Sequence, residues 1–557
     1  MKNKSTLKWL VSALKKETSD IILLTVLNSL ISASAVLFAH DMRKIIDSAV
    51  YRDKSDFKSY AIILGAIIIF QVSVRAVCRR TDEKTKSAIE NKLKKRTYET
   101  ILTRDFATLS AYHTGELQNR MTSDTVIIAD GITTVLPNVT AMLVKIIGAV
   151  FVLMSLDSRF ASIFVIGGIL LIGVTYSFRK VMKKLHKQVQ SADGEVRSYL
   201  QETVENLLVI RCFGGEKKSS DIAVDKMKSH QNIRLKRNMF SNLCNIGFGI
   251  IMNGGYFFGL IWCGIGILNG KISYGTLTEV LQLVNQVQQP FANITGYLPK
   301  YYSMLASAER LIELENLKKD NNDKKINNHK RDELYENLKE IRFENVSFRY
   351  PDGVEVLENF SHTIEKGSFT AIMGHSGIGK STMLKLLISI YDINSGEINF
   401  VMHDDEKISV TGSERPVFAY VPQGNFLMSG TIAEAVSFMS DTTPDMEKAE
   451  KSCRISCADE FIAQLENGYN TLLGENGTGL SEGQTQRIAL ARAIYSDAPV
   501  LLLDESTSAL DELTEKRLLQ NLRQMTNKTV IIITHRKAVL EICDKIIDFD
   551  KRRYYDN

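Results

Sequence analysis

The sequence SFTAIMGHSGIGKSTMLKLLISI at residues 368–390 decides the fold of the C-terminal part of the chain. It begins as an apolar run typical of a buried strand and ends with the apolar spacing of a helix. Between them lies a glycine-rich loop ending in Lys380 and Ser381, which is the pattern of a phosphate-binding loop in its required strand–loop–helix context. Backbone N–H groups of such a loop, together with the helix N-terminus, bind phosphate oxygens. We therefore predict that Lys380 binds the β- and γ-phosphates of ATP and that Ser381 ligates Mg²⁺, with the rest of the phosphate site formed by Gly374, His375, Ser376, Gly377, Ile378, Gly379 and Thr382.

Two further apolar runs end in residues that can act on a phosphate. VLLLDE at 500–505 reads as a central parallel strand, and it ends in Asp504 and Glu505. An ionised pair at the end of so apolar a strand needs a cation or donors, so we predict that Asp504 holds Mg²⁺ and that Glu505 accepts a proton from the attacking water. VIIITH at 530–535 ends in His535. This residue could orient the water at the same sheet edge, although a histidine at a strand end is often structural.

The first three hundred residues contain six apolar runs that are long enough to span a membrane as helices. The two long connections between them are polar, rich in lysine and arginine, and helical in periodicity. By the positive-inside tendency they belong on the cytoplasmic side, as paired helices that project from the bilayer. Leu7, Leu10, Val11 and Leu14 fit a short amphipathic helix on the membrane surface. The predicted spans are 21–40, 60–78, 139–156, 161–178, 243–268 and 277–298.

Composition separates two domains. Residues 318–331 are almost wholly charged or amide-bearing and cannot form a core, so they read as a linker. We predict a transmembrane domain at 1–315, a polar linker at 316–340 and an α/β P-loop ATPase domain at 341–557. The net charge of +5 is small for 557 residues and gives no sign of nucleic-acid binding. The seven cysteines form no disulfide framework, so Cys453 and Cys457 are expected to be reduced thiols.

The order of motifs resembles an ABC transporter of the exporter type over nearly the whole chain. LSEGQ at 480–484 resembles the ABC signature, which usually has glycine where this chain has Glu482. Glu475 lies in a loop like the one that precedes the signature in exporters. HTGELQNR at 113–120 and ENLLVIR at 205–211 resemble the regions that hold the coupling helices. The resemblance further implies a Q-loop, a D-loop and an adenine-stacking aromatic residue at Gln423, Asp511 and Tyr350.

The resemblance implies a dimer of half-transporters in which each ATP lies between the P-loop of one subunit and the signature of the other. Ser481, Gly483 and Gln484 would then face the nucleotide of the partner, and Gln423 would join Ser381 and Asp504 at the Mg²⁺. We expect ATP-driven export by alternating access in a bacterial cell membrane, with the ATPase domain in the cytoplasm. A homodimer is favoured. The alternatives are a heterodimer with unequal ATP sites, which the unusual Glu482 of the signature suggests, and an exporter-like importer.

The sequence leaves the substrate open among small amphipathic molecules, lipids and peptides. Four amide side chains share one face of the sixth predicted span, where they could line a substrate cavity or join helices. Few charges lie deep in the spans, which argues against a dedicated proton or metal-ion path. A soluble mechanical or DNA-repair ATPase is contradicted by six spans, and a purely ATP-gated channel or regulator by the presence of Glu505. The four amides are Gln282, Gln286, Gln289 and Asn293.

Overall fold

The computed structural model contains two compact units, and the chain passes between them more than once. The first unit consists of residues 1–97 and 118–313, and the second of residues 98–117 and 314–557. The structure describes residues 2–156, 158–320, 326–350, 353–424, 427–438, 443–474, 477, 479–525 and 527–550. The second unit therefore includes the tip of the first long connection, which lies far from the rest of that unit in the sequence.

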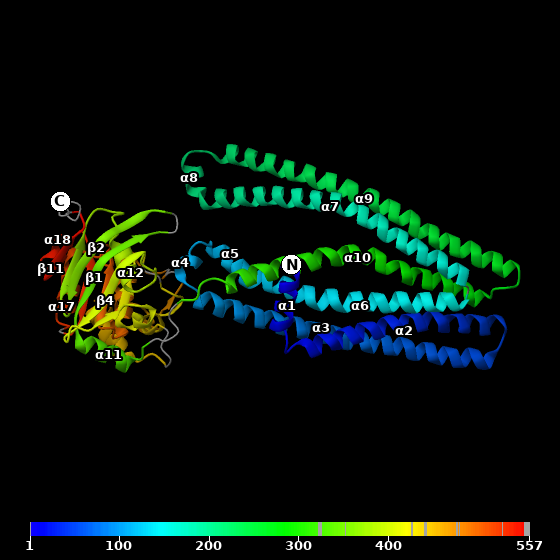
Figure 1. Cartoon of the computed structure of the whole chain (residues 1–557), viewed down its shortest axis with the longest axis horizontal. Helices are drawn as coiled ribbons and strands as arrows, with labels where there is room; N and C mark the ends of the chain where they lie inside the picture. Colours follow the sequence, from blue (N-terminus) through cyan, green and yellow to red (C-terminus); the bar gives the residue numbers. More distant parts are fainter. Residues whose placement is uncertain are drawn as a thin grey trace. The chain divides into compact units, whose positions relative to one another are not determined.

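The first unit is helical throughout its described part (Figure 1). Its helices are long because the apolar runs continue without a break into the amphipathic runs of the connections. Four helical stretches are long and apolar enough to cross a membrane, at Thr18–Val50, Lys54–Thr103, Thr114–Leu156 and Glu216–Leu268. The other two predicted spans, 161–178 and 277–298, lie within α7 and α10. The helices are α1 (Lys2–Ala13), α2 (Thr18–Val50), α3 (Lys54–Thr103), the π-helix η1 (Arg120–Asp124), α6 (Thr125–Leu156), α7 (Ser158–Glu205), α8 (Leu207–Cys212), α9 (Glu216–Leu268) and α10 (Tyr274–Glu315).

The second long connection is a pair of helical extensions, as its periodicity predicts. Helices α7 and α9 run side by side, with the short helix α8 at their end (Figure 1). The tip leaves apolar side chains in solvent, since Val204, Leu208 and Phe213 are all exposed in this chain.

Two separate apolar cores hold the first unit together. One joins α2, α6, α9 and α10 through residues such as Ala39, Leu153 and Leu283. The other joins α1, α3, α6 and α10 through residues such as Ile89 and Ile128. Leu10 and Leu14, predicted to face the membrane surface, are instead buried in this second core, while Val11 is exposed.

The second unit has a parallel five-stranded sheet in the order β11-β3-β10-β9-β6 and an antiparallel sheet in the order β2-β1-β4-β5. In the parallel sheet β3, β9 and β10 are neighbours, so their carboxyl ends meet at one edge. The central strand β9 is buried along its whole length, as its apolar run predicts. The strands are β1 (Leu338–Arg349), β2 (Glu355–Glu365), β3 (Phe369–Met373), β4 (Ser395–Met402), β5 (Lys407–Ser409), β6 (Phe418–Val421), β7 (Gly430–Thr431), β8 (Leu472–Leu473), β9 (Val500–Asp504), β10 (Thr529–Ile533) and β11 (Lys545–Asp548).

The helices of this unit flank the sheets and include two short ones from the first long connection. Residues 328–337 of the predicted linker form α11, and β1 begins at Leu338. The helices are α4 (Phe106–Leu109), α5 (Thr114–Asn119), α11 (Asn328–Asn337), α12 (Lys380–Leu387), the 3₁₀ turn η2 (Gly412–Val417), α13 (Ile432–Ser437), α14 (Met446–Ile455), α15 (Asp459–Ile462), the 3₁₀ turn η3 (Gly468–Asn470), α16 (Glu482–Tyr495), α17 (Glu512–Arg523) and α18 (Lys537–Leu540).

Candidate functional site

The phosphate-binding loop connects β3 to α12. Its glycines Gly374, Gly377 and Gly379 have φ of 142°, 84° and 109°, in the left-handed region that favours glycine. The nearly buried ammonium of Lys380 donates to the carbonyl oxygens of Gly374 and His375, at 2.5 and 3.0 Å. The loop thus folds around its own lysine at the N-terminus of α12, which is the geometry that binds phosphate.

Asp504 ends β9 with its carboxylate almost completely buried. It accepts hydrogen bonds from Ser381 Oγ at 2.9 Å and from the Tyr420 hydroxyl at 3.0 Å. Burial raises the pKa of Asp504, although both hydrogen bonds act in the opposite direction. The Ser381 and Asp504 oxygens are the hard donors that Mg²⁺ prefers, and two protein ligands suffice because this ion usually keeps water and phosphate oxygens as well. The site therefore fits Mg²⁺, which would neutralise phosphate charge there.

Glu505 follows in a left-handed conformation, with φ of 49°. This conformation is costly for a residue other than glycine, and such strained residues cluster at active sites. One carboxylate oxygen accepts from Gln423 Nε2 at 2.9 Å, and the other lies 3.9 Å from His535 Nε2. His535 Nε2 in turn lies 3.3 Å from Lys380 Nζ. Three residues that the sequence nominated separately thus meet at one sheet edge beside the phosphate loop.

Tyr350 lies in an aromatic cluster next to this loop. Its hydroxyl is 2.9 Å from Thr382 Oγ1, and its ring packs edge-on against Tyr391, with centroids 5.3 Å apart. Tyr391 also contacts the ring of Phe106, from α4, at 6.0 Å. The tip of the first long connection therefore contacts the aromatic cluster that holds the candidate adenine-stacking residue.

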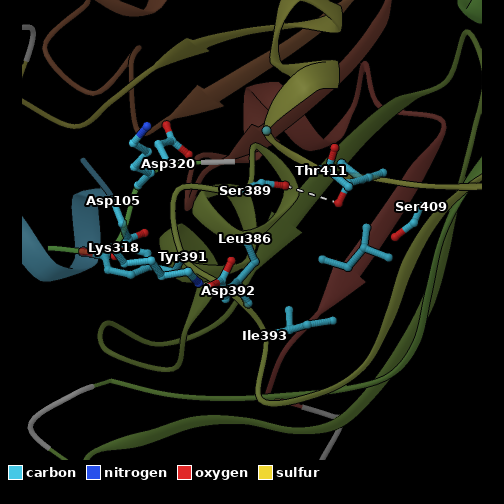
Figure 2. Close-up of a pocket in the computed structure, with 14 residues that line it drawn as sticks. Asp105, Lys318, Asp320, Leu386, Ser389, Tyr391, Asp392, Ile393, Ser409 and Thr411 are labelled. Carbon is cyan, nitrogen blue, oxygen red and sulfur yellow. Dashed lines mark hydrogen bonds and ion pairs between the residues drawn. The ribbon is translucent and has the colours of Figure 1, made fainter. Parts of the chain in front are cut away.

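The same tip is hydrogen-bonded to the chain that enters the ATPase domain. Arg104 and Lys319 form an isolated antiparallel β-bridge, and Asp320 forms an ion pair with Arg415. A cavity of about 190 Å³ lies beside these segments, with an ion pair between Lys318 and Asp392 at its rim (Figure 2). The cavity is lined partly by Leu386 of α12, the helix that begins at the phosphate loop.

The signature residues form the N-terminus of α16. Ser481 caps the helix in a reciprocal capping box with Gln484. A Cβ on Gly483 would lie 2.8 Å from the Ala509 carbonyl oxygen, so only glycine fits without a shift. Glu482 is the first residue of the helix and is exposed. Among the described residues no hydrogen bond joins residues 481–484 to the phosphate loop of the same chain.

The D-loop is held firmly from both sides. Gln486 of the signature helix accepts from the Ala509 backbone N–H at 3.0 Å and donates to Ser508 Oγ. Arg536, which follows His535, donates to the Leu510 carbonyl oxygen. Asp511 caps α17 through the Thr514 N–H. Hydrogen bonds therefore connect the D-loop to the signature helix on one side and to the residue after His535 on the other, within one chain.

Of the four amides of the predicted sixth span, the three whose side chains are described do not share one environment. Gln286 donates to the Ala35 carbonyl oxygen of α2 at 2.8 Å, which joins helices. Gln289 accepts from Lys145 of α6 at 2.9 Å. Gln282 is half-buried. The backbone of Asn293 continues α10, and its side chain lies outside the described part, as does Glu475 of the loop before the signature.

Sequence reasoning missed several functional candidates. Tyr420 and Phe106 gave no signal of their own, because only the fold brings them to Asp504 and Tyr391. Charged residues in the spans could have been found from the sequence, because each is a single charged residue in an apolar run. Lys145 and Glu279 are examples. Glu279 is fully buried and accepts from Arg43 at 3.2 Å and pairs with His40 at 2.8 Å.

Comparisons with known proteins agree with this architecture. The family model described as "ABC transporter transmembrane region" matches residues 21–291, and the model described as "ABC transporter" matches residues 357–508. An ATP-dependent lipid A-core flippase of Photorhabdus laumondii is 30% identical over 440 residues, covering 78% of this chain and 74% of the relative. A putative export ATP-binding/permease protein of Rickettsia bellii is 27% identical over 549 residues, covering 96% and 92%.

A solved structure is similar over nearly the whole chain. A bacterial Atm1-family ABC exporter with ATP bound aligns with a TM-score of 0.80 at 22% identity, covering 96% of this chain and 93% of that one. The predicted fold class, a helical transmembrane domain followed by an α/β ATPase domain, is confirmed. Taken with the geometry of the phosphate site, these likenesses show that the chain belongs to the ABC transporter family, as a membrane exporter-type protein whose ATPase domain couples ATP hydrolysis to transport.

Proposed function

We propose that this chain is one half of a dimeric exporter that moves an amphipathic substrate out of the cell by alternating access. The observation that carries the proposal is the division of the ATP site. Lys380, Asp504 and Glu505 lie together at one sheet edge, whereas Ser481 and Gly483 present an exposed helix N-terminus with no hydrogen bond to the described phosphate loop. A second copy would supply the missing signature to each site.

The exposed tip of the second long connection supports the same proposal. Val204, Leu208 and Phe213 are apolar and exposed in the single chain. Contiguous exposed apolar side chains mark interaction sites. We propose that the ATPase domain of the partner half covers them, in the cytoplasm beneath a bacterial cell membrane.

In the proposed hydrolysis, Glu505 is the general base. Gln423 donates to one of its oxygens, and the other, 3.9 Å from His535 Nε2, would accept a proton from water. Lys380 Nζ and His535 Nε2 lie 3.3 Å apart beside Glu505, where both would bind γ-phosphate oxygens. Nucleotide-driven closure would then bias the two arrangements of the transmembrane helices.

The first test is ATPase activity of the chain purified alone in lipid nanodiscs, beside Glu505→Gln. Loss of the base should lower the rate at least about tenfold, or about 1.4 kcal/mol of transition-state stabilisation. Equal rates in both proteins would overturn the assignment of Glu505.

Mixing two inactive variants tests the dimer. Lys380→Ala disables the phosphate loop and Ser481→Arg disables the signature, so each homodimer lacks both sites. A dimer of one Lys380→Ala chain and one Ser481→Arg chain keeps one intact site. That site combines the unchanged phosphate loop of the second chain with the unchanged signature of the first, so part of the activity should return. Activity of the wild type without any recovery on mixing would contradict the shared site. A folded, ATP-binding wild type with no activity would favour a heterodimer, and Glu482→Gly would then be the first reversion to test.

A further inference from the structure

The chain that follows the last strand passes directly beside the start of the phosphate loop. Strand β11 pairs with β3, and the Phe549 backbone N–H donates to the Met373 carbonyl oxygen at 3.0 Å. A Cβ on Gly374 would lie 2.9 Å from Phe549 Cβ, so a larger residue could not take its place without a shift. The buried Phe549 ring stacks on Phe360, with centroids 5.4 Å apart. The core of the ATPase domain therefore fixes the place of the next residue, Asp550, against the loop.

The Asp550 carboxylate binds two groups of His375, the second residue of the phosphate loop. Its Oδ1 accepts from the His375 backbone N–H at 3.2 Å and lies 2.5 Å from the ring Nδ1. The hydrogen bonds from the His375 ring and backbone, with the nearby Lys380 charge, hold the pKa of Asp550 below its ordinary value. An ionised carboxylate can only accept, so Nδ1 is the donor. One oxygen thus restrains both the main chain and the side chain of His375.

The other side of the same peptide chain is held by the lysine of the loop. Lys380 Nζ donates to the carbonyl oxygens of Gly374 and His375, at 2.5 and 3.0 Å, and lies 3.3 Å from His535 Nε2. His375 therefore connects Asp550, through its N–H, to Lys380, through its C=O. The carboxylate can affect the position of the lysine without a direct contact between them.

A simple surface ion pair would not have this effect. The side chains of His375 and Asp550 are 62% and 49% exposed, and exposed ion pairs contribute little to stability. The contact with the backbone N–H is different in kind, because it restrains the main chain of a loop that binds phosphate through its main chain. We therefore expect the contact to matter for ATP affinity more than for folding.

We propose that Asp550 is a positioning residue of the ATP site, which holds His375, and through it Lys380, in the arrangement that receives the phosphates. The inference rests on the proposed assignment of this loop and of Lys380 as the phosphate site. The loop contacts the phosphates in the bound complex as well as during hydrolysis, so its loosening weakens both states alike. Such a loss raises KM and leaves kcat unchanged.

The test uses the purified full chain in lipid nanodiscs. It measures KM and kcat for ATP hydrolysis and, separately, the dissociation constant of a fluorescent, non-hydrolysable ATP analogue. Asp550→Ala should raise KM and the dissociation constant at least about threefold, with kcat changed less than about twofold. Asp550→Asn keeps an oxygen that can accept from His375 and should restore most of the affinity. Asp405→Ala, which removes a comparably exposed ion pair with Lys339 of the same domain, is the matched control and should behave as the wild type does.

A second pair of variants tests the connection through His375. If the two residues act together, Asp550→Ala should cost less affinity in a His375→Ala background than in the wild type. Wild-type KM and affinity in Asp550→Ala, a lower kcat at unchanged KM, or independent effects of the two substitutions would each overturn the proposal.

Lys380→Ala separates this inference from the site assignment on which it rests. Loss of analogue binding in Lys380→Ala, with wild-type binding in Asp550→Ala, rejects the positioning role and leaves the phosphate site standing. Wild-type analogue binding in Lys380→Ala overturns both.

Discussion

Two charged side chains in the transmembrane unit have opposite surroundings. At Glu279 a fully buried carboxylate accepts from Arg43 of α2 and lies 2.8 Å from the His40 ring of the same helix. At Lys145 a cation on α6 donates to the neutral amide of Gln289 on α10, and among the described residues it forms no ion pair. The first cluster joins α2 to α10 through a charged pair, whereas the second joins α6 to α10 through one hydrogen bond to a neutral acceptor. Four experiments test how much such polar contacts stabilise the unit.

Glu279→Ala should have the largest effect. It leaves His40 and Arg43 without their shared acceptor, and breaking a fully buried pair costs about 3–5 kcal/mol. Because the two partners are 43% and 32% exposed, the loss is expected to be smaller, about 2 kcal/mol. It is measured as a lower unfolding temperature of the purified protein. Glu279→Gln, which retains an acceptor oxygen, should lose less. An unchanged unfolding temperature in Glu279→Ala would remove the structural half of the comparison.

Asp47→Ala tests the same helix contact one level farther out. Asp47 accepts from the Gly275 N–H at 2.9 Å and from Ser273 Oγ at 2.8 Å, at the start of α10. Loss of such a cap costs about 1 kcal/mol. Asp47→Asn keeps one acceptor and serves as the control. If both variants unfold at the wild-type temperature, this contact does not stabilise the α2–α10 seam.

Lys145→Met should change stability much less than Glu279→Ala. It removes one hydrogen bond to a neutral, exposed amide and leaves no buried charge unpaired, so the unfolding free energy should change by less than about 1 kcal/mol. Thermal unfolding without added lipid provides the measurement. A clear loss of stability would mean that Lys145 has a structural role after all.

Asp130 supplies the smallest effect, and it depends on pH. This residue lies outside the spans and accepts from Lys86 and Lys300, at 2.8 and 2.9 Å. Burial alone would raise the pKa of Asp130, but these hydrogen bonds and charges lower it below its ordinary value. Its contribution is therefore present above the unfolded-state pKa and is lost as the pH falls through the lower, folded-state pKa.

Because the three side chains are partly exposed, Asp130→Asn should cost less than about 1 kcal/mol at neutral pH. The difference from the wild type should shrink under acid conditions. Unfolding curves at neutral and acidic pH check this, and a difference that grows on acidification would contradict the assignment.

The sequence predicted the ATPase domain better than the transmembrane one for a physical reason. The phosphate loop is local: strand, glycines, Lys380 and helix follow one another, so pattern and geometry coincide. Contacts of Tyr420 with Asp504, or of Phe106 with Tyr391, join residues far apart in the chain and leave no local pattern. In the spans, apolar periodicity gives length but not helix rotation. For that reason the sequence predicted that Gln286 and Gln289 share one helix face. It did not predict that Gln286 would bind the backbone of α2 while Gln289 would bind Lys145.

The bridge between Arg104 and Lys319 also affects how the protein can be divided in the laboratory. A soluble fragment that starts at residue 326 would contain every ATP-site motif but would lack α4 and the strand partner at 318–320. The aromatic face of Tyr391 would then be exposed to water, and Arg415 would lose the carboxylate of Asp320. Nucleotide affinities measured on such a fragment would therefore describe a domain without part of its own surface.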